Sequence, residues 1–78
     1  MLEYPHTKEV YSMINLHQRY NHYLATGRKH DRVGERIIGY GWTDDGSTLT
    51  GYYVQTENHR LYYDLSENFK FMETWVRA

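Results

Sequence analysis

Five histidines are the side chains of this 78-residue chain best suited to bind a metal or move a proton. His17 and His22 are five residues apart, so they point to different faces of a helix and match no metal-binding pattern such as H-x-x-x-H. The others, His6, His30 and His59, stand at expected ends and turns, and no cysteine offers a thiolate. We therefore expect no metal and no cofactor, and we interpret His17 as a hydrogen-bonded core residue.

Catalytic patterns are weak as well. Asp44 and Asp45 are adjacent carboxylates, but a turn explains both, and we expect them to be solvated rather than raised in pKa as a catalytic acid would be. The glycines of Gly39-Tyr-Gly41 stand within an expected strand, where backbone amides do not converge on a phosphate. No serine has the surroundings of an activated nucleophile. The sequence predicts a protein that is not an enzyme.

A basic segment makes nucleic acid the alternative partner. Its cationic residues are Arg28, Lys29, Arg32 and Arg36. Tyr53 and Tyr62 are candidate platforms on which bases would stack. Nucleic-acid-binding domains usually have a high pI and a positive net charge, whereas this chain has a pI near 6.5 and a net charge of −1. Asp31 and Glu35 also reduce the positive charge of the segment. We therefore rank nucleic acid below a protein partner.

Length and composition set the scale of the molecule. A chain of 78 residues predicts a single small domain over residues 1–78. Its core is modest, so dimerisation would be a natural source of further burial. No apolar run approaches the roughly 20 residues of a membrane span, and no signal peptide is evident, so we expect a cytoplasmic protein.

Residues 7–26 predict one amphipathic helix. Apolar and aromatic residues recur there at steps of three and four, including Met13, Leu16, Tyr20 and Tyr23. Gly27 is placed to end the helix in a left-handed conformation.

Two strands, about residues 35–43 and 48–56, are predicted to fold back at Asp44-Asp45-Gly46. A three-residue loop there, with Gly46 left-handed, would pair Trp42 with Thr48. It would also place Ile38 on the buried face and Ile37 on the other face, because side chains alternate along a strand.

A second turn at Glu57-Asn58 would lead into a third strand, about residues 60–65. It would pair Val54 with Leu61 and Tyr53 with Tyr62. The buried face is then expected to form the core beneath the helix; its members are Ile38, Tyr40, Trp42, Tyr52, Val54, Leu61, Tyr63 and Leu65. The other face of the sheet is expected to stay open, and we call it the open face.

The tail has two interpretations. As a fourth strand, about residues 69–76, it would place Phe69 and Phe71 on the buried face and Met72 on the open face. As a helix, the tail would give the element order α-β-β-β-α, which resembles that of the double-stranded-RNA-binding domain. Residues 66–70 hold one lysine and one glutamate where that family has a lysine cluster, so its function does not carry over. We favour the strand.

The predicted fold class is α+β, with one N-terminal helix packed on a three- to four-stranded antiparallel meander. We expect a non-enzymatic protein-interaction module that uses the open face. The expected contact residues are Ile37, Leu49, Tyr53, Arg60, Tyr62, Asp64 and Met72. Mobile elements such as phages use small domains of this kind as inhibitors, which gives steric occlusion of a host protein as the expected mechanism. The partner is unidentified; a second copy of the chain is the other candidate.

Overall fold

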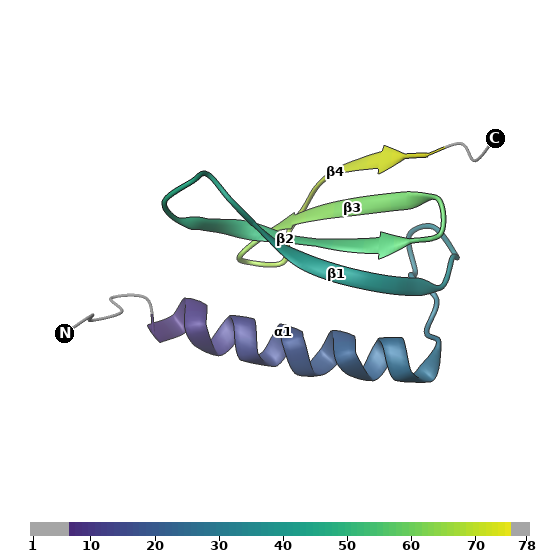
Figure 1. Ribbon diagram of the computed structural model, residues 1–78, viewed down its shortest axis with the longest axis horizontal. Coiled ribbons are helices and arrows are strands. Elements are labelled where there is room, and N and C mark those ends of the chain that lie inside the picture. The colour runs from purple at the N-terminus through teal and green to yellow at the C-terminus, as the bar shows by residue number, and fades with distance from the viewer. Residues whose placement is uncertain (1–6, 76–78) are drawn as a thin grey trace.

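The computed structural model of the chain describes residues 7–75. Helix α1 (Thr7–Thr26) is followed by strands β1 (Ile37–Asp44), β2 (Leu49–Thr56), β3 (His59–Asp64) and β4 (Phe69–Thr74). The strands form one antiparallel sheet in the order β1-β2-β3-β4, and α1 lies along one side of it (Figure 1). The predicted α+β class is confirmed, and residues 69–74 form the strand. Residues 76–78, which include the expected end of that strand, lie outside the described residues.

The end of α1 follows directly from the sequence. Gly27 has a φ of +67°, and the Arg28 backbone N–H donates to the carbonyl of Tyr23 at 3.1 Å. This is the Schellman arrangement, in which a left-handed glycine lets the chain turn back and satisfy a carbonyl of the last helical turn. The chain therefore leaves α1 toward the sheet.

One helix stripe and one sheet face form the core. The buried apolar and aromatic side chains are Leu16, Tyr20, Ile37, Tyr52, Val54 and Leu61. Leu16 and Tyr20 are four residues apart, so they lie on the same side of α1. Tyr40, Trp42 and Tyr63 pack against this cluster from the sheet. His17 is exposed, so its expected place in the core is wrong, although its ring contacts the Tyr40 hydroxyl.

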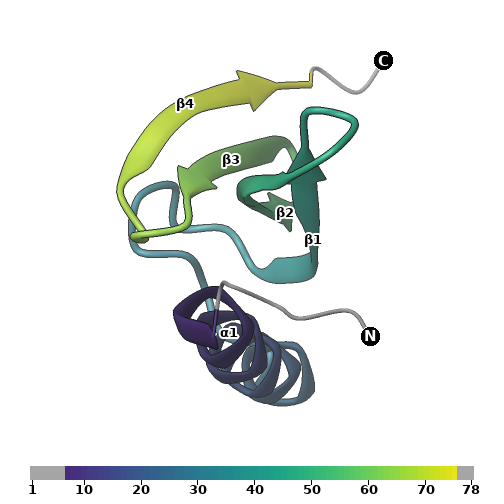
Figure 2. The ribbon, with the colours of Figure 1, turned by 90° about the vertical axis from the view of Figure 1, so that its left-hand side faces the viewer.

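Helix α1 covers only part of the sheet. Figure 2 shows the sheet curling away from α1, so that β4 lies farthest from the helix. Along β4 every described side chain after Phe69 is exposed. The large apolar side chains Phe71 and Met72 are among them, at 51% and 41% exposure. Because neighbouring residues of a strand point to opposite faces, β4 leaves apolar groups uncovered on both sides.

The first hairpin has the expected glycine but a wider loop. Gly46 is left-handed, with a φ of +98°, while β1 runs to Asp44 and β2 begins at Leu49. Asp45 holds the loop, because its Oδ1 accepts hydrogen bonds from the backbone N–H groups of Ser47 and Thr48 at 3.1 and 2.8 Å. These bonds lower the pKa of Asp45 to about 2.

The wider loop, together with a bulge in β2 between Leu49 and Gly51, shifts the pairing of β1 with β2. Trp42 pairs with Tyr52, so the predicted pairing of Trp42 with Thr48 is wrong. The shift is even, and the side chains of a strand alternate, so Trp42 and Tyr52 still share the face that α1 covers.

The two adjacent isoleucines have exchanged roles. Ile37 is 3% exposed and belongs to the core, whereas Ile38 is 43% exposed. A bulge between Ile37 and Gly39 adds one residue to β1, which reverses the direction of every side chain on its far side. The expectation of Ile38 in the core and Ile37 on the open face is therefore wrong.

A second bulge changes the tail in the same way. Between β2 and β3 the predicted register is confirmed, with Val54 opposite Leu61 and Tyr53 opposite Tyr62. Between β3 and β4 the register shifts after Tyr62, so that Phe71 pairs with Tyr62 and Met72 pairs with Leu61. Phe71 lies on the open face and Met72 on the opposite face, which corrects the predicted places of both.

The connection between α1 and β1 is an ordered loop anchored by Glu35. The loop is closed by an antiparallel bridge between Lys29 and Arg36. The carboxylate of Glu35 reaches the β2–β3 turn. Its Oε1 accepts hydrogen bonds from the Thr56 hydroxyl at 2.7 Å, the Asn58 backbone N–H at 3.0 Å and His59 Nδ1 at 2.9 Å. These donors, with His59 first, lower the pKa of Glu35 to about 2.

We expect Glu35→Gln to destabilise the protein near neutral pH, with a penalty that shrinks as the pH falls. The pKa of Glu35 is about 2 in the folded chain against an ordinary 4.5. Its contribution to the free energy of unfolding is therefore complete above pH 4.5 and is lost as the pH falls toward 2. Urea unfolding at a series of pH values measures the difference between wild type and variant. Glu57→Gln, in the same turn, is the control; identical pH profiles for the two variants would contradict the anchoring role.

Candidate functional site

A row of three aromatic side chains crosses the open face of the sheet, which is the face turned away from α1. Tyr53, Tyr62 and Phe71 come from β2, β3 and β4, and each is the direct cross-strand partner of the next. The rings of Tyr62 and Phe71 are stacked with centroids 4.4 Å apart, and those of Tyr53 and Tyr62 are 6.1 Å apart. Exposure is greatest at Phe71, where the sheet ends. The row is the centre of the open face.

Arg60 extends the aromatic row at one end. Its guanidinium lies over the ring of Tyr53 at 4.4 Å and over Trp75 at 5.3 Å. Its Nε donates a hydrogen bond to Gln55 Oε1 at 2.9 Å. A guanidinium that lies over a ring makes a cation–π contact and can still donate hydrogen bonds from its edge. We call Tyr53, Arg60, Tyr62, Phe71 and Trp75 the aromatic row surface.

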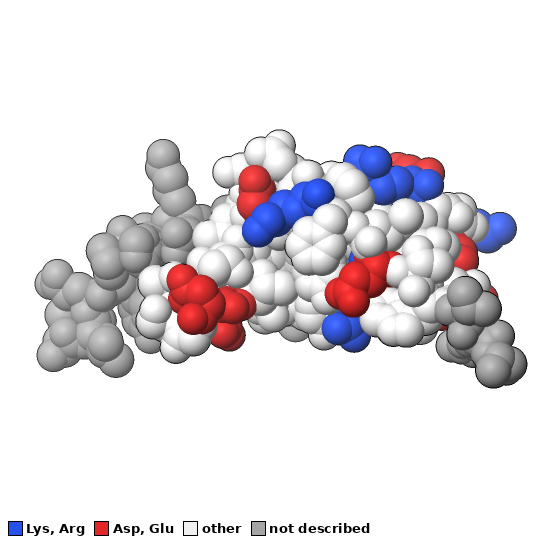
Figure 3. Space-filling model, turned by 90° about the horizontal axis from the view of Figure 1, so that it is seen from above, with Lys and Arg blue, Asp and Glu red and all other residues white. Residues whose placement is uncertain are grey.

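Charges around the aromatic row surface have both signs. Glu73 is the cross-strand partner of Arg60, and its carboxylate beside the Tyr62 hydroxyl raises the pKa of Tyr62. Seen from the side opposite α1, uncharged side chains make up most of the surface, with small acidic and basic groups scattered among them (Figure 3). This mixture lacks the continuous basic surface that a nucleic-acid backbone requires.

Four of the seven predicted contact residues lie elsewhere or have another role. Ile37 is in the core, and Met72 is on the opposite face beside Leu61. Leu49 lies beyond a bulge in β2, where it pairs with Asp44 at the end of the hairpin. Asp64 caps the β3–β4 turn, because its Oδ1 accepts the backbone N–H groups of residues 66 and 68. Tyr53, Tyr62 and Arg60 are on the open face, as their register places them.

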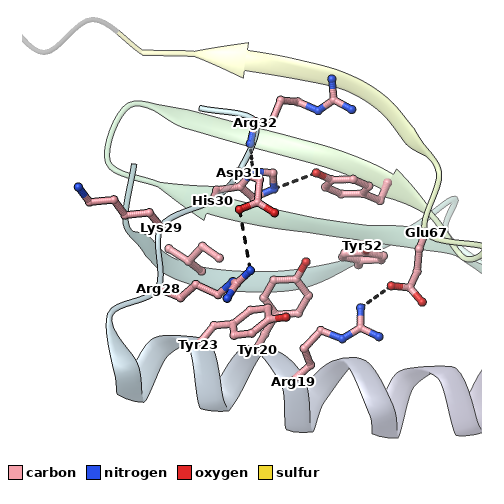
Figure 4. A pocket seen from close by; sticks show the side chains of 12 residues that line it. Arg19, Tyr20, Tyr23, Arg28, Lys29, His30, Asp31, Arg32, Tyr52 and Glu67 are labelled. Atoms are coloured by element: carbon pink, nitrogen blue, oxygen red, sulfur yellow. Dashed lines mark hydrogen bonds and ion pairs between the residues drawn. The ribbon is translucent and has the colours of Figure 1, made fainter. Parts of the chain in front are cut away.

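A pocket of about 490 Å³ lies between α1, the loop after it and the covered face of the sheet (Figure 4). Its charged lining consists of Arg19, Arg28, Lys29, Asp31, Arg32 and Glu67. Its aromatic lining includes Tyr20, Tyr52 and Tyr63. Four cationic side chains against two anionic ones leave a net charge of +2 when His30 is neutral. We call this cavity the basic pocket.

The predicted nucleic-acid site is not assembled. Arg28, Lys29 and Arg32 line the basic pocket together with tyrosines of the covered face. Tyr53 and Tyr62 project from the other face of the sheet, because they alternate with Tyr52 and Tyr63 along β2 and β3. Arg36 lines a separate shallow cavity with residues 24–27 and the start of β1. The sheet therefore stands between the cations and their expected stacking platforms.

Aromatic faces hold two of the pocket arginines in place. The Arg28 guanidinium lies over the Tyr23 ring at 4.8 Å, and the Arg32 guanidinium lies over the Phe69 ring at 3.9 Å. Arg28 also faces the exposed carboxylate of Asp31 at 3.9 Å. Within residues 13–75, neither Lys29 nor Arg32 forms an ion pair. The charge of Arg28 is therefore neutralised only in part, and no ion pair among these residues neutralises the charge of Arg32.

The fourth cation of the pocket is paired across its mouth. Arg19 of α1 contacts the carboxylate of Glu67 in the β3–β4 turn (Figure 4). This pair raises the pKa of Arg19. Glu67 has a φ of +67°, a left-handed conformation that is uncommon for any residue except glycine.

His30 and Tyr63 form the inner wall of the basic pocket. His30 Nδ1 accepts a hydrogen bond from the Arg32 backbone N–H at 3.0 Å, so the neutral ring carries its hydrogen on Nε2. Nε2 lies 2.9 Å from the Tyr63 hydroxyl oxygen and donates to it. Burial lowers the pKa of His30, which favours this neutral form, and burial raises the pKa of Tyr63. The Tyr63 hydroxyl therefore keeps its own hydrogen available to a further acceptor.

Sequence reasoning missed several residues of both regions. Phe71 and Trp75 were hidden by the register shift in the tail, which no local pattern signals. Arg19 and Glu67 are 48 residues apart in the chain, and only the docking of α1 on the sheet brings them together. The sole available signal was the density of cations in residues 28–36, three of which line the basic pocket.

Comparisons with known proteins leave the function to physical argument. No protein-family model, curated protein sequence or solved structure matches the chain. Within residues 7–75, no helix is long and apolar enough to cross a membrane. Among the side chains that the structure describes, those of residues 13–75, no group of three or more histidines, cysteines, aspartates or glutamates could hold a metal ion.

Proposed function

We propose that the chain is a small non-enzymatic protein-binding module and that its contact site is the aromatic row surface. The observation that carries the proposal is the stack of Tyr62 on Phe71, of which Phe71 is 51% exposed. Tyr, Trp and Arg are the residue types most enriched at binding hot spots, and all three occur in this surface. Ring stacking holds the side chains in position, so little conformational entropy is lost on binding.

The edge of the sheet adds a second contribution. Among the described strands, β4 pairs only with β3, so one of its edges offers backbone N–H and C=O groups to a strand of another protein. A partner strand there would also cover the apolar side chains that β4 exposes. Binding of this kind would block the partner's own surface, which is the steric inhibition expected of a small protein from a mobile element, acting in the cytoplasm of its host.

We expect the double variant Tyr62→Ala/Phe71→Ala to lose partner binding by about a hundredfold or more, since each hot-spot side chain contributes about 2 kcal/mol or more. The readout is affinity capture on immobilised protein, with the captured protein identified by mass spectrometry and its affinity then measured with purified components. Circular dichroism verifies that the variant keeps its fold.

The matched control is Ile14→Ala/Leu24→Ala, which removes two exposed apolar side chains of α1. A partner that is retained by wild type and by this control, but lost with the aromatic variant, supports the proposal. A partner held equally by all three proteins contradicts it. If the captured partner is the chain itself, light scattering will show a concentration-dependent dimer that the aromatic variant abolishes.

A further inference from the structure

We propose that the basic pocket binds the phosphoryl group of a small organic phosphate. The pocket lies on the other side of the sheet from the aromatic row surface, so this site is separate from the protein-binding site proposed above. Its volume of about 490 Å³ falls within the range of small-molecule sites in proteins. Four observations carry the proposal.

The first observation is the charge. Lys29 and Arg32 have no ion-pair partner among residues 13–75, and Arg28 faces only the exposed Asp31. These three cations of one short loop therefore line one cavity with little internal compensation. Figure 4 shows the Arg28 guanidinium turned into the cavity, the Arg32 guanidinium turned toward β4 and the Lys29 amine turned outward. A dianionic group such as a phosphate would supply the missing negative charge.

The second observation is the geometry of the donors. The guanidinium groups of Arg28 and Arg32 each lie over a ring, with Cζ at 4.8 and 3.9 Å from the ring centroid. Contact with a ring restrains a guanidinium and leaves its N–H groups able to pair with two oxygens of a phosphate. Lysine would act there as a point charge.

The third observation is the Tyr63 hydroxyl. Its oxygen accepts the hydrogen of His30 Nε2, and among the described residues its own hydrogen meets no acceptor. An O–H group that lines a cationic cavity with its hydrogen available is a donor for a bound anion. The tyrosine therefore adds a directional hydrogen bond to the charges of the loop.

The fourth observation concerns the rigidity of the loop after α1 and the neutralisation of Arg19 by a carboxylate. The loop that carries the three cations is closed by the Lys29–Arg36 bridge, and Glu35 ties it to the β2–β3 turn. Across the mouth, the carboxylate of Glu67 neutralises Arg19. A bound phosphate would compete with this carboxylate for Arg19. Removal of the Glu67 charge should therefore strengthen binding.

The experiment is a titration of the uniformly ¹⁵N-labelled chain, followed by amide chemical shifts at low ionic strength. The probes are inorganic phosphate and adenosine monophosphate, with sodium chloride of equal ionic strength as the blank. We expect saturable shifts in residues 28–32 with at least one phosphate probe and none with the blank. Tighter binding of the nucleotide than of phosphate would identify the ester as the source of the group; no saturable shift with either probe overturns the proposal.

Variants test the assignment of residues. Arg28→Gln/Arg32→Gln should weaken binding about tenfold or more, because two charge-assisted contacts are lost. Glu67→Gln should tighten binding about two- to fivefold, as expected for removal of one exposed competing charge. Arg36→Gln/Lys70→Gln is the control for net charge, because neither residue lines the pocket.

Two outcomes would overturn the assignment. One is an equal loss of affinity in the control and in Arg28→Gln/Arg32→Gln, which would indicate unspecific attraction. The other is unchanged or weaker binding by Glu67→Gln. The Glu67 variant keeps every cation of the pocket, so it decides the question even if the double arginine variant fails to fold.

Discussion

Replacing Ile37 by alanine should lower the free energy of unfolding by about 2–5 kcal/mol, the range measured for removal of large buried aliphatic side chains. Ile37 is 3% exposed and packs with Tyr20 and Tyr52 in the core. The neighbouring replacement Ile38→Ala should change it by less than about 1 kcal/mol, because Ile38 is 43% exposed. The two variants differ only in which of two consecutive isoleucines is shortened.

Urea unfolding followed by circular dichroism measures both variants. A domain of this size has a total stability of about 4–12 kcal/mol, so Ile37→Ala could leave too little folded protein for a reliable baseline. Ile37→Val, with an expected loss of about 0.5–1.5 kcal/mol, then gives the measurable comparison. A larger loss for the Ile38 variants than for the Ile37 variants would show that β1 lacks the bulge and that the alternation read from the sequence is correct.

Gly51→Ala should also destabilise the chain, by about 1–3 kcal/mol, as overpacking of a filled site does. A Cβ atom on Gly51 would overlap the carbonyl oxygen of Tyr63, and backbone cannot move aside as a flexible side chain does. Relief would require β2 and β3 to separate where Tyr52 stacks on Tyr63 with centroids 5.1 Å apart. The expected effect therefore includes loosening of that aromatic pair.

Gly39→Ala is the matched control for Gly51→Ala. A Cβ atom on Gly39 would meet only the Cβ of Gln55, at an ordinary contact distance of 3.7 Å. We expect a change of less than about 1 kcal/mol, because a tolerated Gly→Ala exchange mainly reduces the entropy of the unfolded chain. Thermal unfolding of the two variants is the measurement, and equal melting temperatures would contradict the close contact at Gly51.

The sheet separates two surfaces of different chemistry. On the covered face, tyrosines extend from the core to the basic pocket, whereas the aromatic row lies on the open face. Substitutions at Arg28 and Arg32 should therefore leave protein binding unchanged, and substitutions at Tyr62 and Phe71 should leave phosphate binding unchanged. This independence makes the two proposals separately testable.

Much of the fold could be predicted from local patterns. The helix was predicted because its apolar residues repeat with the helical period, and its end because Gly27 suits a left-handed position. The β2–β3 register was predicted because a two-residue turn leaves little choice of pairing. These features depend on residues close together in the chain, so the local sequence determines them.

The surfaces could be predicted only in part. A bulge in β1 and another register shift beside β4 each reverse the alternation of side chains, and they exchanged Ile37 with Ile38 and Phe71 with Met72. A bulge is selected by how well the whole strand packs against its neighbours, and the strand's own residues carry no sign of it.

By itself, the sequence determined the helix, the first three strands, their order and the β2–β3 hairpin, because these rest on periodicity and turn chemistry within short segments. Only the tertiary structure decided which apolar side chains face outward and that Arg19 and Arg28 line the same cavity. The directions of these side chains depend on contacts between residues far apart in the chain. Those contacts form together when α1 and the loop after it pack on the curled sheet.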